Sequence, residues 1–352
     1  MENCFLFYKT LNKFFLVLVV IYSIILIACS DFGTEFNGNN KDKWHGKLSV
    51  DFIHSILKPD GTVWGWGNNS SGTLGNGTDI SSDYPVKVVN LVNIISIDQS
   101  YGAEVALDVS GNVWFWGNLF IYFGPPNIDT NVVTPIKLTQ IENPKTISMD
   151  GIYIYVMTTT GRIYYIKMDF YSPNVVEGPT LIRNIARASY LNKSLCICDE
   201  GQIFNLHTTA SLQDNNLNAI CKISGAINRH IVVLKKDGTV WGWGHNDLGQ
   251  LGNGTYEDSQ KPIQTFNLFD IIEVSANYDY NLALRKDGTV WYWGYCGRIG
   301  DSLISQNIPV KIDSLPKAVS ICSGFNGLIM TIDGSYWLFN VNKKLKTKIR
   351  FN

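Results

Sequence analysis

The chain has 352 residues, of which 45% are hydrophobic and 17% charged, and its formal net charge is −1. This length and apolar content are sufficient for a large hydrophobic core. The strongly basic balance typical of nucleic-acid-binding proteins is missing, so we expect no nucleic-acid partner.

Residues 1–28 have the pattern of a secretory signal. Lys9 and Lys13 lead into the apolar run Phe14–Ile27, which is short for a transmembrane helix. The run ends next to Cys29, and the sequence around this cysteine resembles the bacterial lipobox, in which the chain is cut before a cysteine that then carries lipid. We therefore predict a lipoprotein signal peptide; an ordinary signal peptide and an uncleaved anchor are the alternatives.

Residues 29–43 are predicted to hold the lipidated Cys29 and a flexible tether, because Ser30–Lys43 is rich in Asp, Gly, Asn and Lys with little to bury. The lipid would attach the protein to one leaflet without spanning the membrane. Ser30, not an aspartate, follows the cysteine. By resemblance to the known sorting rule, this favours the outer membrane or the cell surface.

One phrase recurs along the remaining chain, residues 44–352. Asp60–Gly67 reads DGTVWGWG, which returns at Asp237–Gly244 and, with one change, at Asp287–Gly294. Turn glycines recur every 37 to 50 residues: Gly61, Gly111, Gly161, Gly201, Gly238, Gly288 and Gly334. A repeat of this length is typical of stacked supersecondary units.

Each unit is predicted to contain about four short strands, which fits a propeller blade. Around Gly238, the apolar run Ile231–Lys235, an Asp-Gly turn, the return strand Val240–Gly244 and the edge strand Lys261–Gln264 follow one another. We assign the repeated tryptophans to packing within blades; a ligand cage is the alternative. These are Trp64, Trp66, Trp114, Trp116, Trp241, Trp243, Trp291, Trp293 and Trp337.

The repeated phrase, the tail Gly72–Thr78 with its second copy Gly249–Thr255, and the following Tyr84–Val88 resemble the RCC1 (regulator of chromosome condensation) repeat family. The resemblance covers nearly all of residues 44–352. It implies an all-β fold, a seven-bladed β-propeller of RCC1-type repeats. The third and fourth units depart from the tryptophan phrase, which is replaced by Tyr164–Ile166 and Phe204–Leu206. These units are either degenerate blades or blades specialised to bind a partner.

The ends of the repeat region suggest how the ring closes. Half a unit precedes Asp60 and half a unit follows Gly334, so we expect the C-terminal segment to pair beside the N-terminal one. Lys344–Phe351 alternates cations with apolar residues and Thr347. It is either an outer strand guarded by lysines or a patch that touches anionic headgroups.

The cysteines indicate no metal site. Cys196 and Cys198 would share one face of a strand, so they cannot easily bridge each other, and no CxxC pair is present. We expect buried free thiols and leave open the disulfide state of Cys196, Cys198, Cys221, Cys296 and Cys322.

We find no catalytic motif. The five histidines show no HExxH spacing, there is no GxSxG elbow, and no glycine loop leads into a helix that could hold phosphate. We therefore predict no enzyme, no catalytic residue and no cofactor.

A candidate binding face comes from seven equivalent connections, each lying just before the strand that precedes a turn glycine. In a propeller these connections gather on one face around the axis, and aromatic and arginine side chains are typical of binding hot spots. The alternative is that the rings tuck between blades and cover the core. The residues are Phe52, Tyr101, Tyr153, Lys193, Arg229, His230, Tyr278, Tyr280 and Phe325.

Three functions follow from these features. The first is a monomeric binding scaffold on the cell envelope that docks a protein partner, of unknown identity, through one propeller face. The second is a binder of glycan or cell-wall polymer, for which Tyr278, Asp279 and Tyr280 would supply stacking and hydrogen bonds. The third is an enzyme with a site in the central channel, which requires clustered titratable groups on the axis; the sequence reveals no such cluster.

Overall fold

The structure is a computed structural model that describes residues 48–50, 53–100, 102–119, 131–169, 174–182, 188–198, 201–207, 210–211, 217–225, 229–277, 279–299, 302–324, 326–340 and 345–349. The chain divides into two compact units, Met1–Phe32 and Gly33–Asn352. The predicted signal peptide, Cys29 and the tether lie outside the described residues. Over the described ranges, no helix has the length and apolarity needed to cross a membrane.

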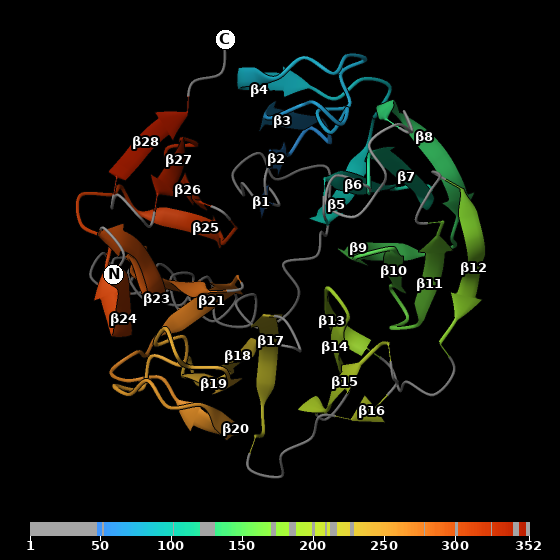
Figure 1. The fold of residues 1–352 in the computed structure, drawn as a ribbon. Coiled ribbons are helices and arrows are strands. Elements are labelled where there is room, and N and C mark those ends of the chain that lie inside the picture. Colours follow the sequence, from blue (N-terminus) through green and yellow to red (C-terminus); the bar gives the residue numbers. More distant parts are fainter. Residues whose placement is uncertain are drawn as a thin grey trace, which may run out of the picture. The chain divides into compact units, whose positions relative to one another are not determined.

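The second unit is a ring of seven four-stranded antiparallel sheets, or blades (Figure 1). Each blade is one continuous stretch of chain, with its first strand next to the axis and its fourth strand outermost. The fold is therefore the expected all-β, seven-bladed propeller.

Blades 1 to 3 contain twelve strands. Blade 1 contains β1 (Leu48–Val50), β2 (Ile53–Leu57), β3 (Val63–Gly67) and β4 (Ser82–Lys87). Blade 2 contains β5 (Ile94–Ser100), β6 (Ala103–Asp108), β7 (Asn112–Gly117) and β8 (Val132–Gln140). Blade 3 contains β9 (Pro144–Asp150), β10 (Tyr153–Thr158), β11 (Ile163–Met168) and β12 (Val175–Leu181).

Blades 4 to 7 complete the ring. Blade 4 contains β13 (Ala188–Asn192), β14 (Leu195–Cys198), β15 (Ile203–Asn205) and β16 (Ala210–Ser211). Blade 5 contains β17 (Ile220–Gly225), β18 (His230–Lys235), β19 (Val240–Gly244) and β20 (Ser259–Gln264). Blade 6 contains β21 (Ile271–Ala276), β22 (Tyr280–Arg285), β23 (Val290–Ile299) and β24 (Ser302–Lys311). Blade 7 contains β25 (Ala318–Cys322), β26 (Gly327–Thr331), β27 (Tyr336–Asn340) and β28 (Leu345–Ile349).

The repeated phrase builds the turn between the second and third strands. In blade 1 the carboxylate of Asp60 accepts hydrogen bonds from Thr62 N at 2.9 Å and Thr62 Oγ1 at 2.5 Å. Trp64 Nε1 donates to the same hydroxyl oxygen at 3.0 Å. Gly61 has a φ of +76°, which a glycine adopts without strain. Asp, Gly, Thr and the first Trp are therefore used together to form this turn.

The second tryptophan of the phrase joins neighbouring blades. Trp116 Nε1 of blade 2 donates to Thr73 O in the glycine-rich loop of blade 1 at 2.8 Å. Trp293 Nε1 of blade 6 donates to Gln250 O of blade 5 at the same distance. Both indole rings are fully buried. In the structure, these two tryptophans therefore pack between neighbouring blades.

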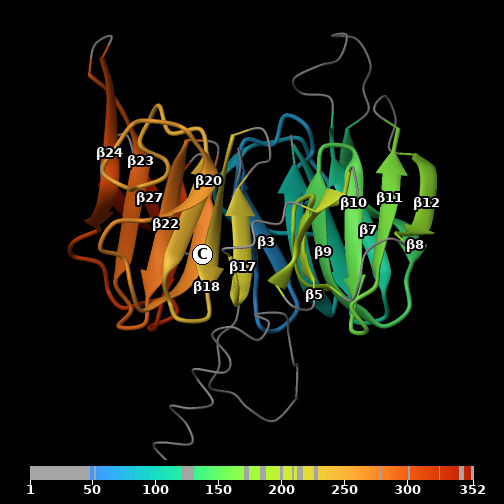
Figure 2. The ribbon, with the colours of Figure 1, turned by 90° about the horizontal axis from the view of Figure 1, so that it is seen from below.

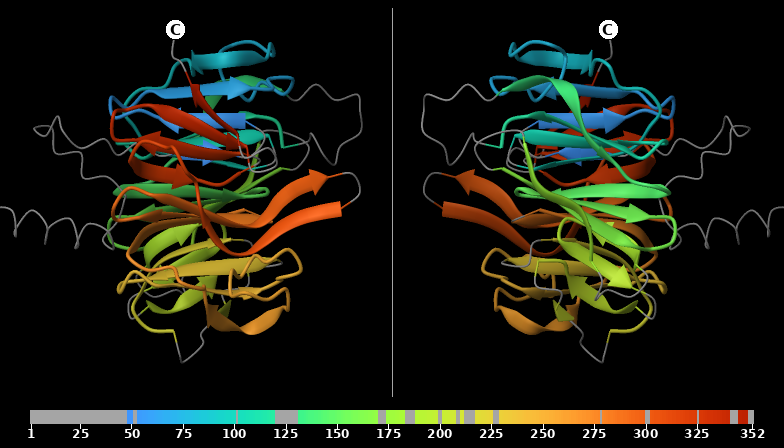
Figure 3. Two further views of the ribbon diagram at one scale, coloured as in Figure 1. Left: turned by 90° about the vertical axis from the view of Figure 1, so that its left-hand side faces the viewer. Right: turned by 90° about the vertical axis from the view of Figure 1, so that its right-hand side faces the viewer.

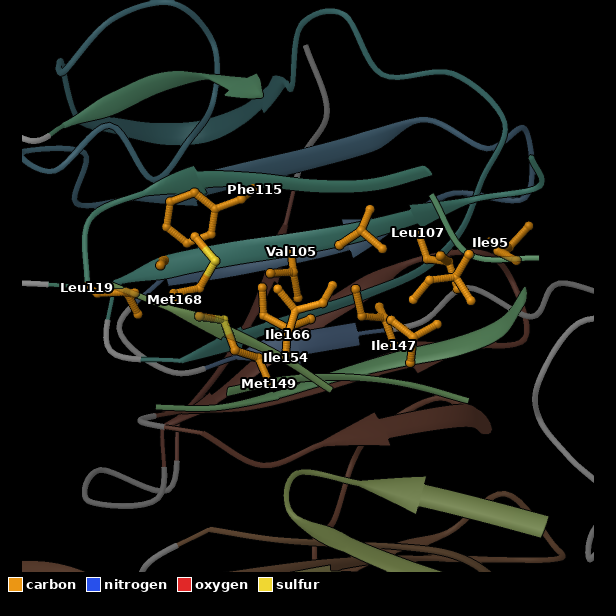
Figure 4. Close-up of a cluster of buried hydrophobic side chains, with 14 residues drawn as sticks. Ile95, Val105, Leu107, Phe115, Leu119, Ile147, Met149, Ile154, Ile166 and Met168 are labelled. Atoms are coloured by element: carbon orange, nitrogen blue, oxygen red, sulfur yellow. The ribbon is translucent and has the colours of Figure 1, made fainter. Parts of the chain in front are cut away.

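The hydrophobic core lies between blades and not in one central mass. Figure 4 shows the cluster between blades 2 and 3, where Val105, Leu107 and Phe115 face Ile147 and Met149. Strand alternation directs every second side chain of a blade toward a neighbouring blade. Stacking blades face to face around the axis therefore buries both surfaces of each sheet.

The ring closes by packing and not by strand pairing, so the expected pairing of the C-terminal segment beside the N-terminal one is wrong. Blade 7 is complete in itself, with the order β25-β26-β27-β28. It contacts blade 1 through a cluster in which Leu328, Met330 and Tyr336 meet Ile56 and Trp66. Each half unit at the chain ends belongs to a whole blade, because a blade begins at its inner strand and not at its turn glycine.

The topology gives the propeller two different faces. We call upper face the end that carries the connections between first and second strands and between third and fourth strands, at the top of Figure 2. We call lower face the end that carries the turns between second and third strands and the blade-to-blade connections. The ten-residue strands β23 and β24 extend beyond the other blades on the upper face (Figure 3).

The outermost strands carry features that discourage pairing with another chain. A proline interrupts the fourth strand in five blades, and prolines and lysines are typical guards of exposed sheet edges. In blade 4 the fourth strand is only two residues long, and in blade 7 it carries Lys346 and Lys348. The prolines are Pro85, Pro135, Pro179, Pro262 and Pro309.

Candidate functional site

The seven connections of the predicted binding face join first to second strands, so they lie on the upper face near the axis. Phe52, Tyr101, Tyr278 and Phe325 lie outside the described residues, and their role stays a prediction. Tyr153 and Lys193 are partly exposed, and the side chain of Arg229 is 53% exposed. Arg229 lies 3.9 Å from Asp279, a surface ion pair of little energetic weight.

Two residues of the predicted face are buried, and for them the alternative of rings tucked between blades holds. His230 is 1% exposed, and its Nε2 lies 2.7 Å from Asn281 Oδ1 of blade 6. Tyr280 is 3% exposed, and its hydroxyl oxygen accepts a hydrogen bond from Gly324 N of blade 7 at 3.3 Å. As the first residues of second strands, both point at the next blade. The burial of Tyr280 also removes one of the two rings from the glycan site expected around Asp279.

The inner strands bring polar groups together around the axis, which the sequence did not reveal. Asp98, Lys193, Glu273 and Cys322 interact electrostatically although they come from four different blades. Burial raises the pKa of Asp98 and of Glu273, against hydrogen bonds and neighbouring lysines that lower it. Burial, with Asp98 and Glu273 adding to it, raises the pKa of the Cys322 thiol to about 12.

These axial groups satisfy backbone donors of the neighbouring blade. An inner strand has no sheet partner on its axial edge, so its N–H groups need other acceptors. Asp98 Oδ2 accepts from Met149 N at 2.9 Å, Glu273 Oε2 from Ile321 N at 3.2 Å, and Ser275 Oγ from Ser323 N at 2.8 Å. The thiol stays protonated and the carboxylates are hydrogen-bonded. We therefore interpret this axial cluster as structural.

A second cluster lies where blade 3 meets blade 4. His207 Nε2 lies 3.1 Å from Asp150 Oδ2, and His207 Nδ1 lies 3.0 Å from the hydroxyl of Tyr155. Because a carboxylate only accepts, the tautomer that satisfies both contacts is the one that donates from Nε2 to Asp150 and accepts at Nδ1 from Tyr155. These two hydrogen bonds take the place of the tryptophan hydrogen bond seen between blades 1 and 2 and between blades 5 and 6. Blade 4 has Leu206 at the position where blades 2 and 6 have the second tryptophan.

Aromatic and acidic side chains extend this chain toward solvent. The ring of Tyr153 lies edge-on to His207 with centroids 5.0 Å apart, and 6.4 Å from the ring of Tyr165. The hydroxyl of Tyr165 donates to Glu177 on the outer strand β12. We call the six residues Asp150, Tyr153, Tyr155, Tyr165, Glu177 and His207 the blade 3–4 cluster.

The blade 3–4 cluster is open because blade 4 is short. Strands β15 and β16 have three and two residues, against six and seven in β11 and β12. The first five residues of β12 are all exposed, so neither of its faces is covered there. The side chains of Asp150 and His207 are about one third exposed, whereas Tyr155 is 1% exposed. The cluster thus has a rigid buried base and an accessible rim.

Charge at this rim is balanced. Burial raises the pKa of Asp150, but hydrogen bonds from His207 and Ser194 and the charge of Lys193 bring it below its ordinary value. Lys167 is paired in register with both Tyr153 and Glu177, so a cation stands in the same row. The described residues contain no group of three metal-binding side chains. The rim thus offers aromatic faces, hydrogen-bonding groups and charges of both signs.

Sequence reasoning named Tyr153 but missed the other members of the blade 3–4 cluster. Asp150 and His207 are 57 residues apart. The signal in the sequence was that the third and fourth units depart from the tryptophan phrase. This departure allowed the interpretation that they are specialised to bind a partner. Aligning the repeats would have placed His207 directly after the missing second tryptophan.

Comparison with known proteins finds a repeat-family match in two parts of the chain. Residues 60–105 and 237–284 match the Regulator of chromosome condensation (RCC1) repeat family. The ultraviolet-B receptor UVR8 of Arabidopsis thaliana is 23% identical over 72% of this chain and 56% of its own length. Protein RCC2 of Homo sapiens is 24% identical over 62% of this chain and 42% of its own length. The chain thus spans about half the length of these relatives.

The solved structures that resemble this chain include two of yeast RCC1, also called Prp20. Prp20p of Saccharomyces cerevisiae, studied for its binding to Gsp1p and histones, is 18% identical, with a TM-score of 0.47 over 86% of this chain and 75% of that chain. Yeast RCC1 (Prp20) bound to Kap60 gives a TM-score of 0.46 at 16% identity over 86% of this chain and 73% of that chain.

Proposed function

We propose that this propeller, which carries RCC1 repeats, is a binding scaffold that docks a protein partner through its upper face at the blade 3–4 cluster. The observation that carries the proposal is the accessible rim, where Tyr153 and Tyr165 are partly exposed and Glu177 is exposed, beside the hydrogen-bonded Asp150, His207 and Tyr155, of which only Tyr155 is buried. Aromatic rings held by packing lose little conformational entropy on binding, which is why they are frequent hot spots.

The relatives support a docking role without naming the partner. Yeast RCC1 is known in complex with Kap60, and Prp20p binding was studied with Gsp1p and histones. Those partners belong to those proteins. For this chain we propose a partner that meets the upper face, and we propose no catalytic activity, because the axial carboxylates of Asp98 and Glu273 already accept hydrogen bonds from backbone donors of the neighbouring blade.

We further propose that the scaffold is held at the cell envelope by lipid on Cys29, at the outer membrane or the cell surface. The apolar run before this cysteine and its resemblance to a lipobox support the proposal. Metabolic labelling with a clickable fatty acid tests it directly. We expect labelled protein from the native chain and none from a Cys29→Ala chain; equal labelling of the two would refute the anchor.

The docking site is tested with purified full-length chain and cross-linking mass spectrometry in an envelope extract. We expect a captured protein to be lost with Tyr153→Ala and with Glu177→Ala, and to be kept with Tyr84→Ala. Tyr84 is a matched control, because it is a 55% exposed tyrosine on the outer strand of blade 1. Equal capture by all chains would place docking elsewhere, and capture of polysaccharide at the same residues would favour the glycan alternative.

A further inference from the structure

On the lower face, some turns and blade-to-blade connections expose apolar side chains and others expose polar ones. Two exposed apolar residues lie two positions before an inner strand. Val92, in the connection to blade 2, is 68% exposed, and Phe269, in the connection to blade 6, is 52% exposed. The tips of the turns in blades 2 and 7 are Val109 and Ile332, which are 51% and 68% exposed. We call these four residues the lower apolar arc.

Backbone hydrogen bonds hold each of these tips against a neighbouring connection or turn; that of Ile332 runs from its N to Lys317 O at 2.8 Å. Val109 N donates to Asn93 O at 3.0 Å, which places the tip of blade 2 beside the connection that carries Val92. Lys286 N donates to Asp270 O at 2.9 Å, next to Phe269, whose ring also lies 4.8 Å from the Arg285 guanidinium. The apolar tips are therefore held rigidly, so exposing them does not reflect a loose loop.

The arc is centred on the blade through which the chain enters the propeller. Blades 6 and 7 lie on one side of blade 1 and blade 2 lies on the other (Figure 1). Inner strands run from the lower to the upper face, so Leu48 joins the preceding chain at the lower face. Blade 3, farther from this entry point, exposes Glu142 and Thr159 at the corresponding positions.

We propose that the lower apolar arc rests on a lipid bilayer, with the four tips inserted at the headgroup level and the upper face directed away from it. Eighteen residues, 30–47, separate Cys29 from β1, a leash of at most about 60 Å that reaches the bilayer without fixing an orientation. Rigid apolar tips centred on the leash would supply that orientation, because their burial is favourable and the leash keeps them close.

The charges around the arc predict the kind of lipid surface. The turns and connections of this face carry four cations and four anions around the arc: Lys58, Arg285, Lys286 and Lys317, and Asp60, Asp270, Asp287 and Asp333. Because the signs balance, contact would not require anionic lipid and would depend little on salt. A zwitterionic phosphatidylcholine surface is therefore the appropriate probe. The inference rests on the proposed anchor to bring the arc to the membrane.

Site-specific photo-crosslinking tests this orientation in the full-length chain reconstituted in phosphatidylcholine vesicles. Benzoylphenylalanine is placed at Val109 or Ile332, and in control chains at Ile80 or Tyr256, which are exposed apolar residues of the upper-face loops. We expect at least about tenfold more lipid adduct from the two lower positions, unchanged between low and high salt.

The outcomes separate the arc from the anchor. Equal lipid adduct at upper and lower positions would overturn the proposed orientation even where Cys29 carries fatty acid. Lipid adduct could also be confined to the lower positions while Cys29 takes no fatty acid. That result would support membrane contact by the arc and would refute only the lipid anchor. Crosslinks from Val109 to a second copy of the protein, in place of lipid, would assign the arc to a dimer interface and overturn the proposal.

Discussion

Ser148 Oγ donates a hydrogen bond to Asp98 Oδ2 at 2.7 Å, from the inner strand of blade 3 to that of blade 2. The same oxygen accepts from Lys193 N of blade 4 at 2.6 Å. One hydroxyl group thus connects three consecutive blades at the axis. Its dual role explains why a small polar residue is useful at this place.

Ser148→Ala should lower the free energy of unfolding by about 2 kcal/mol, because the backbone N–H of Lys193 and the carboxylate of Asp98, both partly buried, each lose a hydrogen-bond partner. Urea denaturation followed by tryptophan fluorescence measures it. Ser82→Ala is the control, since Ser82 Oγ donates to Tyr84 O at 2.7 Å in an exposed strand. Equal losses for the two variants would contradict the structural role of the axial serine.

Gly111→Ala and Gly334→Ala should differ although they change the same turn position. Their φ angles are similar, +83° and +75°. A Cβ on Gly111 would lie 1.8 Å from Ile141 O of the next connection, whereas nothing lies within 4 Å of one on Gly334. We expect about 1 kcal/mol of destabilisation at Gly334 from φ alone and at least about 3 kcal/mol at Gly111, by urea denaturation. Equal losses would show that the turn, and not the neighbouring blade, dictates glycine.

Glu104 should make stability fall as the pH rises. Burial raises its pKa from 4.5 to about 8, and Asp98 adds to the effect. Between these two values the folded chain keeps a proton that the unfolded chain releases, so its stabilising contribution is complete below 4.5 and is lost by about 8.

Glu104→Gln should therefore flatten the dependence of the free energy of unfolding on pH between 5 and 8 by an amount on the order of 3 kcal/mol. Chemical denaturation across this range measures it. Glu257→Gln, at an exposed loop position, should leave the slope unchanged. A native slope that matches the Glu104→Gln slope would contradict a buried, protonated carboxyl group.

Trp293→Phe should cost more stability than Trp291→Phe. Trp293 is fully buried between blades, so the smaller ring leaves a cavity and Gln250 O loses one of its two donors. Trp291 Nε1 donates to Thr289 Oγ1 within its own partly exposed turn. We expect losses of about 2 and under about 1 kcal/mol by thermal or urea unfolding. The reverse order would contradict the division of labour between the two tryptophans.

The sequence allowed the fold to be predicted because the signals were local and repeated. Turn glycines, the tryptophan phrase and edge prolines each act within one hairpin or between adjacent blades. The closure of the ring was misjudged because a turn glycine marks the middle of a blade, and counting from it divides the first and last blades. The blade 3–4 cluster could not be predicted from spacing, since Tyr155, Asp150 and His207 meet only when two blades stack.

The axial cluster shows what an internal alignment could have added. Two positions recur in the inner strands of blades 2, 3, 6 and 7. The first position holds Ser96, Thr146, Glu273 and Ser320, and the second, two residues later, holds Asp98, Ser148, Ser275 and Cys322. Each such residue was unremarkable alone. Only the register of four separate sheets places them around one axis.

The seam between blades 7 and 1 has a mechanical consequence. Every other pair of consecutive blades is joined by the chain itself, whereas this seam consists of side-chain packing. Tension applied through the N-terminus loads blade 1 first, and blade 1 can separate from blade 7 without breaking any strand ladder. The ring therefore has a built-in opening point, and a clamp across Ile56 and Leu328 would raise the force at which it yields.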